Sequence, residues 1–304
     1  MSLLTVGTVA FDSIETPYGK VEKVIGGTAT YICWAASYFC KHQNLVSVIG
    51  DDWPAEEIEA LRAQGIDTRG LQIIEGEKSF FWKGKYHDDL NQRDTLVTDL
   101  NVLADFDPVL PEAYQQSDYL MLGNLTPEIQ MAVIRQMENR PKLIAMDTMN
   151  FWMDVAMESL LETIKMVDIL TINDEEARQL SGEYSLVKAA KKIFELGPKY
   201  LVIKKGEHGA LLFHQEEVFF APALPLLEVK DPTGAGDTFA GGFMGYLAKT
   251  DDASFENLKR ALIYGSAMAS FCVEEFSLDR LRNITANELQ QRLSKFKNLV
   301  HYNL

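Results

Sequence analysis

Short runs rich in β-branched and other apolar residues alternate with amphipathic helical stretches along most of this 304-residue chain. Such alternation is typical of a parallel β-sheet that is covered by helices on both faces. The strands that the pattern predicts are Leu3–Val9, Val46–Ile49, Tyr119–Leu122, Leu143–Asp147, Ile169–Ile172, Tyr200–Lys204 and Ala210–Phe213. No repeat or low-complexity linker interrupts them, so we expect a single domain over residues 1–304.

Two segments, residues 11–25 and 71–102, break this alternation. The first contains a Pro-Tyr-Gly turn between short extended pieces. The second places Phe80, Trp82 and Tyr86 on one face at the period of a strand. Two distant pairs of strands can therefore form one small additional sheet. A plain extension of the core by β-strands is the alternative.

The composition restricts the partners and the location of the protein. Hydrophobic residues make up 47% of the chain, and 29 basic against 44 acidic side chains give a net charge of −15, which argues against a nucleic-acid surface. The three cysteines lack metal-site spacing, and the N-terminus has no basic leader. No apolar run approaches the ~18 residues of a membrane span. We expect a cytoplasmic protein with reduced thiols that binds neither nucleic acid nor membranes.

A glycine-rich run, Asp231-Pro232-Thr233-Gly234-Ala235-Gly236-Asp237, directly precedes an apolar helix. Glycines let backbone amides approach an anion closely, and a helix N-terminus adds partial positive charge, so the run predicts a phosphate cradle. A Walker loop is excluded because no lysine follows Gly236, and a dinucleotide fingerprint because Phe239 stands where its last glycine belongs. Asp237 is either an ordinary first-turn acid or a general base for phosphoryl transfer.

Four motifs, taken in order, resemble those of the ribokinase-like (PfkB) carbohydrate kinases over nearly the whole chain. They are the Gly26-Gly27 pair, the Asn173-x-x-Glu176 box, the turn at Lys205–Ala210 and the run Asp231–Asp237. The resemblance implies an α/β fold of the ribokinase type, a three-layer αβα sandwich with a central, mostly parallel sheet. It also implies that residues 11–25 and 71–102 form a small β-sheet lid over the substrate, through which two copies of the chain could form a homodimer.

The resemblance assigns the chemistry to the glycine-rich run. It implies that Asp237 is the general base, which takes the proton of the acceptor hydroxyl. The amides of Gly234, Ala235 and Gly236 would form the anion hole for the transferred phosphate. Some members of the family bind potassium at this run, and Asp231 and Thr233 match that site only by resemblance.

ATP and Mg²⁺ are the cofactors that the resemblance implies. Asn173 and Glu176 match the residues that organise magnesium and the nucleotide phosphates, usually through water, whereas their spacing alone favours helix capping. Further matches to the ATP site are Lys204, Gly206 and Thr233. Glycines in a tight turn between strands need no ligand, which is the alternative for Gly206.

Asp12 matches the family's acid that binds acceptor hydroxyls, a task that suits carboxylates because each oxygen accepts hydrogen bonds from adjacent hydroxyls. An ordinary turn residue is the alternative. Gly26 and Gly27 would allow the backbone to approach the same ligand, and Asn124 would line the site. Tyr31 stands where many sugar kinases have an asparagine, which suits either stacking on a base or a tyrosine of the core.

We therefore expect a kinase that transfers the γ-phosphoryl group of ATP to an alcohol of a small-molecule sugar. A nucleoside acceptor is the alternative, because Tyr31 and the stretch Asp147–Trp152, which lacks the family's arginine, depart from the sugar-kinase pattern. A protein of another class, a nucleotide- or sugar-binding sensor without turnover, would fit the same departures. The intact Asp237 argues against such a sensor.

Overall fold

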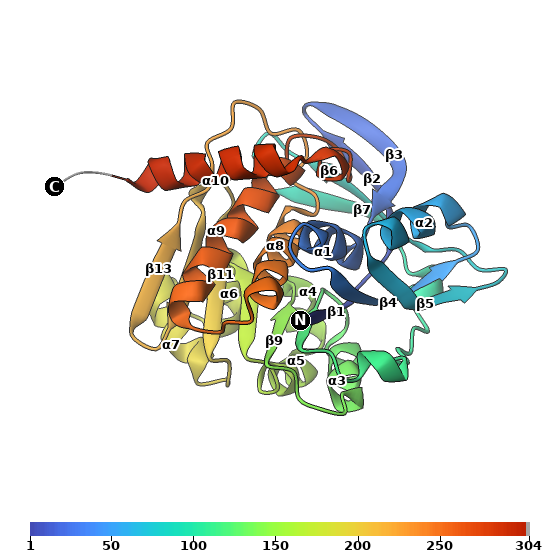
Figure 1. Cartoon of the computed structure of the whole chain (residues 1–304), viewed down its shortest axis with the longest axis horizontal. Coiled ribbons are helices and arrows are strands. Elements are labelled where there is room, and N and C mark those ends of the chain that lie inside the picture. Colours follow the sequence, from blue (N-terminus) through green and yellow to red (C-terminus); the bar gives the residue numbers. More distant parts are fainter. Residues whose placement is uncertain (302–304) are drawn as a thin grey trace.

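The computed structural model describes residues 1–301, which form two β-sheets and the helices around them (Figure 1). The predicted domain reaches to residue 304, and residues 302–304 lie outside the described part. The large sheet has nine strands in the order β13-β12-β11-β10-β9-β8-β1-β4-β5. Their bounds are β1 Ser2–Val6, β4 His42–Gly50, β5 Ile66–Ile74, β8 Tyr119–Leu122, β9 Leu143–Asp147, β10 Ile169–Asn173, β11 Tyr200–Lys204, β12 Ala210–His214 and β13 Glu217–Ala221.

Neighbouring strands from β5 to β11 in this order pair in parallel, whereas β12 and β13 are antiparallel at one edge. The sheet is therefore mostly parallel, as the sequence predicts. Strands β8 and β9 consist entirely of buried residues. A strand that is buried on both faces reads as a continuous apolar run, which explains why these strands are evident in the sequence.

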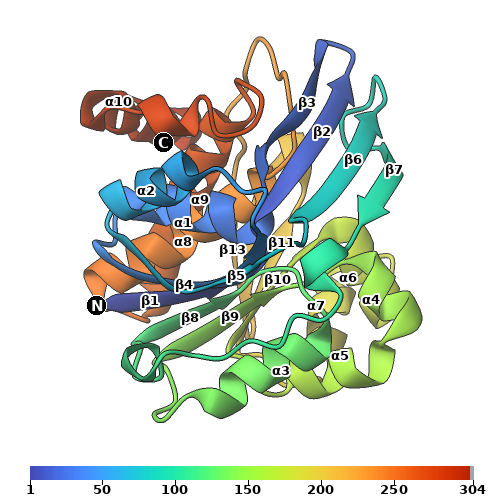
Figure 2. The same cartoon turned by 90° about the vertical axis from the view of Figure 1, so that its right-hand side faces the viewer.

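Helices cover both faces of the large sheet and complete three layers (Figure 2). One face carries α3 Pro127–Gln136, α4 Asn150–Val155, α5 Met157–Ile164, α6 Asp174–Ser181 and α7 Leu186–Phe194. The other carries α1 Thr28–Ser37, α2 Ala55–Ala63, α8 Ala235–Thr250, α9 Phe255–Cys272 and α10 Ala286–Val300. Short 3-10 helices are η1 Asn101–Leu103, η2 Glu112–Tyr114, η3 Gly206–His208 and η4 Leu281–Asn283.

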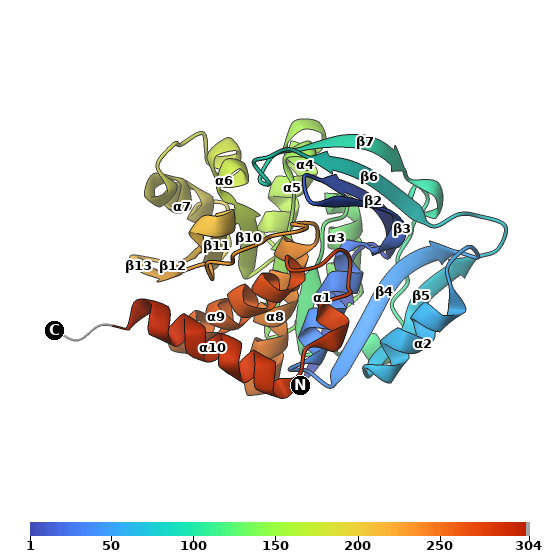
Figure 3. The same cartoon turned by 90° about the horizontal axis from the view of Figure 1, so that it is seen from above.

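The small sheet, called the lid sheet below, has four strands in the order β3-β2-β6-β7. They are β2 Ala10–Thr16, β3 Gly19–Gly26, β6 Phe80–Tyr86 and β7 Arg93–Asp99. Two antiparallel hairpins, β2–β3 and β6–β7, are joined by the parallel pair β2–β6. Figure 3 shows the four strands as one curved layer. The prediction that two distant segments form one sheet is confirmed.

The predicted lid segment 71–102 begins too early. Residues 71–74 belong to β5, where Leu71 pairs with Ser47 of β4 in the large sheet, and the lid sheet takes up the chain again only at Phe80. The period of a strand does not say which sheet the strand joins, and that is the source of the error.

The three cysteines, Cys33, Cys40 and Cys272, are buried and unpaired. No helix within residues 1–301 combines the length and the apolar character that crossing a membrane requires.

Candidate active site

Polar side chains gather where neighbouring parallel strands end. Asn124 follows β8, and Asp147, Asn173 and Lys204 are the last residues of β9, β10 and β11. Ligands of open α/β sheets bind outside the carboxyl ends of the strands, near the point where the strand order reverses. Here that point is β1, which has β4 on one side and β8 on the other.

The glycine-rich run forms a tight turn into α8. Gly234 is the N-cap of α8 with φ +73°, in the left-handed region, and a Cβ there would lie 2.5 Å from the ring of Tyr31. Only glycine satisfies both conditions. The Thr233 amide donates to Asp231 Oδ1 at 2.8 Å, which fixes the turn. The run therefore fixes the N-terminus of α8, with Asp237 in its first turn, and a helix N-terminus favours anions.

Asp237 has the properties of a base that works at neutral pH. Burial, together with the charge of Asp147, raises its pKa to about 7, and the cations of Lys204 and Arg93 limit the rise. A general base is most effective when its pKa lies near the working pH. The raised pKa thus fits the role predicted for Asp237.

Lys204 brings a cation to the same space. Its Nζ lies 2.7 Å from Asp147 Oδ2, and a Cβ on Gly236 would lie 3.3 Å from this nitrogen. Burial lowers the pKa of Lys204, but Asp147 and Glu176 outweigh burial and raise it overall. The side chain is therefore charged and stands next to Gly236 of the glycine-rich run. Asp147 has no role in the sequence prediction, although its place at the end of β9 could have suggested one.

Asn173 and Glu176 form a capping box at the start of α6. The Asn173 side chain accepts from the Glu176 amide at 2.8 Å, and Glu176 Oε2 accepts from the Asn173 amide at 2.7 Å. The capping function that the spacing favours is thus confirmed. Glu176 is also buried, and burial and Asp147 raise its pKa to about 7. Their predicted contact with magnesium stays a prediction.

Asp12 lies in β2 on the lid side of the site and is 5% exposed. Burial and then Asp231 raise its pKa to about 7, while the Gly27 amide, which donates to the carboxylate, opposes the rise. A Cβ on Gly26 would lie 1.9 Å from Asp12 Oδ2. The Gly26-Gly27 pair therefore holds Asp12 in place, whatever further contact it makes with a ligand.

Tyr31 is 1% exposed and packs in the core of the α1 side against Gly234. Its hydroxyl has no hydrogen-bond partner among residues 1–301. Such burial fits the core tyrosine that the sequence left open, and acceptor binding by Tyr31 stays a prediction. Asn124 is half-buried, and its Oδ1 accepts from Trp152 Nε1 at 2.8 Å.

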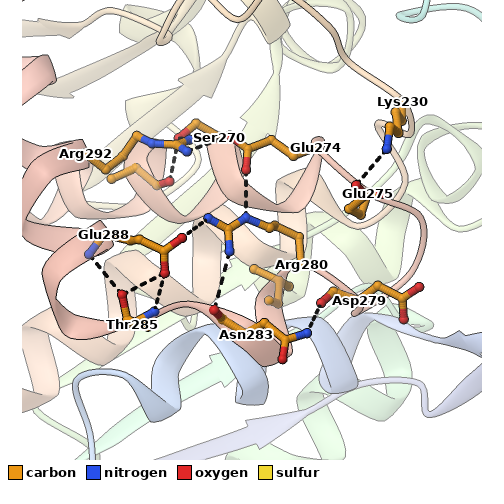
Figure 4. Close-up of polar contacts among 12 residues, drawn as sticks. Lys230, Ser270, Glu274, Glu275, Asp279, Arg280, Asn283, Thr285, Glu288 and Arg292 are labelled. Atoms are coloured by element: carbon orange, nitrogen blue, oxygen red, sulfur yellow. Dashed lines mark hydrogen bonds and ion pairs between the residues drawn. The ribbon is translucent and has the colours of Figure 1, made fainter.

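An ion-pair network holds the loop that follows α9. Glu274 lies between two arginines, 2.8 Å from Arg280 Nε and 2.6 Å from Arg292 Nη2 (Figure 4). The Val273 carbonyl in this loop accepts from the amide of Lys230 at 2.9 Å, immediately before the glycine-rich run. Helix α10, which carries Arg292, thereby supports the start of the run.

Comparison with known proteins gives one consistent result. Residues 2–282 match the sequence model of a protein family that is described as "pfkB family carbohydrate kinase". The cytidine kinase of Thermococcus kodakarensis is 30% identical over 248 residues, which are 80% of this chain and 87% of that protein.

Two solved structures have the same fold. The nucleoside kinase of Methanocaldococcus jannaschii, an archaeal member of the ribokinase family, has a TM-score of 0.77 at 20% identity, covering 97% of this chain and 98% of that one. A candidate ribokinase II of E. coli in complex with ATP and Mg²⁺ has a TM-score of 0.79 at 18% identity, covering 98% and 99%. The fold that the sequence predicted is confirmed.

Proposed function

This chain belongs to the pfkB family of carbohydrate kinases and is a phosphotransferase with an alcohol acceptor; on that premise we propose that it transfers the γ-phosphoryl group of ATP to a nucleoside, with Asp237 as the general base. The observation that carries the proposal is the place of Asp237 in the first turn of α8, beside the glycines of the anion hole and with a pKa of about 7.

In the proposed reaction the acceptor hydroxyl gives its proton to the Asp237 carboxylate while its oxygen forms a bond to the γ-phosphorus. The bond between that phosphorus and the bridging oxygen of the β-phosphate breaks, and ADP leaves. The amides of Gly234, Ala235 and Gly236 donate to the transferred group, and Lys204 adds positive charge. Positioning and charge stabilisation account for most of the catalysis of phosphoryl transfer.

The residues at the site fit an Mg²⁺–ATP complex. The site holds three acidic groups, Asp147, Glu176 and Asp237. Burial and the charge of Asp147 raise the pKa of Glu176 and of Asp237. Within residues 1–301 no three His, Cys, Asp or Glu side chains converge closely enough to hold a metal by themselves. Asn173 and Glu176 would therefore hold the ion through water molecules, several of which Mg²⁺ commonly keeps. The ion would neutralise charge on the phosphates.

A potassium site at Asp231 and Thr233 is a further part of the proposal. Asp231 is 1% exposed, and its Oδ2 has no hydrogen-bond partner among the residues that the structure describes. Burial raises the pKa of this carboxyl to about 6. A buried carboxylate oxygen without a donor is costly, and a bound cation would compensate it.

Two observations support a nucleoside as the acceptor. The cytidine kinase of T. kodakarensis reaches 30% identity over most of this chain. Phe151, 51% exposed, and Trp152 pack edge to face beside Asn124, and aromatic faces suit a nucleobase. Asp12 would bind the ribose hydroxyls. A free sugar is the second candidate, since the family description names carbohydrate kinases.

Release of ADP from Mg²⁺–ATP, measured over a panel of nucleosides and free sugars, tests the proposal. We expect the highest kcat/KM with a nucleoside and a phosphorylated nucleoside as the product in mass spectrometry. A preference for a sugar such as ribose would reject the nucleoside and keep the kinase. If no acceptor stimulates ADP release, a binding protein without turnover replaces the enzyme.

Two expectations from the sequence remain proposals about the setting of this reaction. The first is a homodimer through the lid sheet, supported by Leu96 and Leu100, which are about half exposed at the edge strand β7 and just after it. The second is action in the cytoplasm on small molecules, without nucleic-acid or membrane partners. Light scattering of the purified chain measures the oligomer directly.

A further inference from the structure

The lid sheet turns one face toward the glycine-rich run. Tyr86 of β6 is 6% exposed and accepts a hydrogen bond from Thr233 Oγ1 at 3.1 Å. Arg93 of β7 lies directly opposite Tyr86 in the antiparallel pair, and residues opposite each other project from the same face of a sheet. The ring of Trp82 lies 5.9 Å from Arg93 Cζ. The Arg93 side chain is therefore on the face that looks toward the run.

The hairpin β6–β7 also reaches the opposite wall of the site. Its tip brings Asn91 so close to the turn after β11 that a Cβ on Gly206 would lie 2.4 Å from Asn91 Oδ1. Arg93 follows two residues later, while its partner Tyr86 contacts Thr233. Arg93 thus lies in the part of the hairpin whose neighbours contact both the turn at Gly206 and the glycine-rich run.

Arg93 acts on the Asp237 carboxylate but is not bound to it. Burial raises the pKa of Asp237, and the Arg93 cation opposes this shift. Among residues 1–301 no carboxylate oxygen lies within 4.0 Å of the Arg93 guanidinium, whereas Lys204 is paired with Asp147 at 2.7 Å. Arg93 is exposed. It is a cation with free donors at the mouth of the site.

We propose that Arg93 is a further catalytic residue, which donates hydrogen bonds from the lid to the γ-phosphoryl group during its transfer. The inference rests on the proposed function. A guanidinium presents a planar fork of donors that matches phosphate oxygens. Charge spreads over the equatorial oxygens of the transferring group, where the anion hole of α8 reaches from one side and Arg93 from the other. The lid thus supplies part of the catalytic charge.

Steady-state kinetics of Arg93→Gln test this role. We expect kcat to fall about 100-fold, as when one donor to a transition state is lost, with KM values for ATP and acceptor changed less than about threefold. Arg93→Lys is expected to retain an intermediate kcat. Added guanidinium ion is expected to raise kcat of Arg93→Ala. The matched control is Lys85→Gln, on the other face of the lid sheet and paired with Glu15, which we expect to leave kcat unchanged.

A second readout does not depend on turnover. Isothermal titration with ADP, Mg²⁺ and fluoroaluminate, which imitate the transferring group, is expected to show about 100-fold weaker binding in Arg93→Gln and equal binding of ADP alone. If Arg93→Gln loses this affinity while the unsubstituted chain phosphorylates no acceptor, the proposed function is rejected and Arg93 is kept as a ligand of the phosphoryl group. Unchanged analogue affinity, or a change confined to KM for ATP, would overturn the inference.

Discussion

At the scale of residues, the site combines acids that burial keeps partly protonated with cations that limit this effect. Burial raises the pKa of Asp12, Glu176 and Asp237 to about 7 and that of Asp231 to about 6. Such shifts gather where groups exchange protons or await a charged ligand. Substrate and metal ions would supply positive charge and donors that the free protein lacks.

With Asp237 as the base, as proposed, its raised pKa sets the pH dependence of the reaction. The base must be ionised to accept the hydroxyl proton, so kcat/KM for the acceptor is expected to rise with pH up to about 7 and to level off above it. Asp237→Asn is expected to lower kcat about 1,000-fold and to remove this rise. Initial rates between pH 5.5 and 9 measure both effects. Asp252→Asn, in an exposed loop, is the control, and an equal loss there would point to a general effect of charge.

The sequence predicts a role for Asp237 because it belongs to a motif whose spacing is local, and one for Asp12 by its resemblance to the family's acid after the first strand. It does not predict Asp147 or Arg93. Asp147 ends a buried strand and reads as part of the core, and nothing around Arg93 distinguishes it from a surface arginine. Their proximity to Asp237 arises from the order of β9 to β11 and from the docking of the lid sheet, which one chain segment does not encode.

At the scale of elements, the entry into α8 depends on a single backbone conformation. Gly234 and Gly182 both have positive φ, +73° and +69°, but a Cβ meets the Tyr31 ring at Gly234 and open space at Gly182. Gly182→Ala is expected to cost about 1 kcal/mol of stability from backbone strain. Gly234→Ala is expected to cost about 3 kcal/mol, since overpacking adds to strain, and to lower kcat.

Urea denaturation of the two variants measures this difference. Equal losses of stability would show that the Tyr31 ring moves aside without cost, and that the close packing beneath the glycine-rich run is not required. Activity of folded Gly234→Ala then separates the effect on the proposed anion hole from the effect on stability.

The sequence predicts most strands of the large sheet, because apolar runs bounded by turn residues are distinct. It misses β13 and β5, the two edge strands of the sheet, and places residues 71–74 of β5 in the lid instead. Both strands include exposed residues, which weaken the apolar pattern. The start of the lid is wrong for the same reason. An edge strand and a lid strand look alike until their partners are known.

At the scale of the whole molecule, contacts between distant parts of the chain surround the glycine-rich run. Thr16 Oγ1 donates to the Lys230 carbonyl at 2.9 Å, and Ser277 Oγ donates to the Ile25 carbonyl at 2.5 Å. Glu274, joined to Arg280 and Arg292, fixes the loop that carries Ser277 (Figure 4).

Glu274→Gln is expected to lower the free energy of unfolding by about 1–3 kcal/mol, because two arginines lose their shared carboxylate in a partly buried place. The control is Glu256→Gln, which removes an exposed i,i+3 pair with Lys259 and is expected to cost less than about 0.5 kcal/mol. Chemical denaturation of both variants gives the comparison. Equal, small changes would mean that α10 does not stabilise the loop.

The parallel pairing of β2 with β6 has a consequence for the order of folding. Ala10 pairs with Phe80, and α1, β4, α2 and β5 all lie between them in the chain. Each two-stranded hairpin is only marginally stable alone. We therefore expect the four-stranded sheet to form only after the stretch between β2 and β6 has brought the two hairpins together. On this basis we expect the lid sheet to form late in folding and to be less stable than the nine-stranded core. Under its proposed role as a lid, it could open for a substrate while the rest of the protein stays folded.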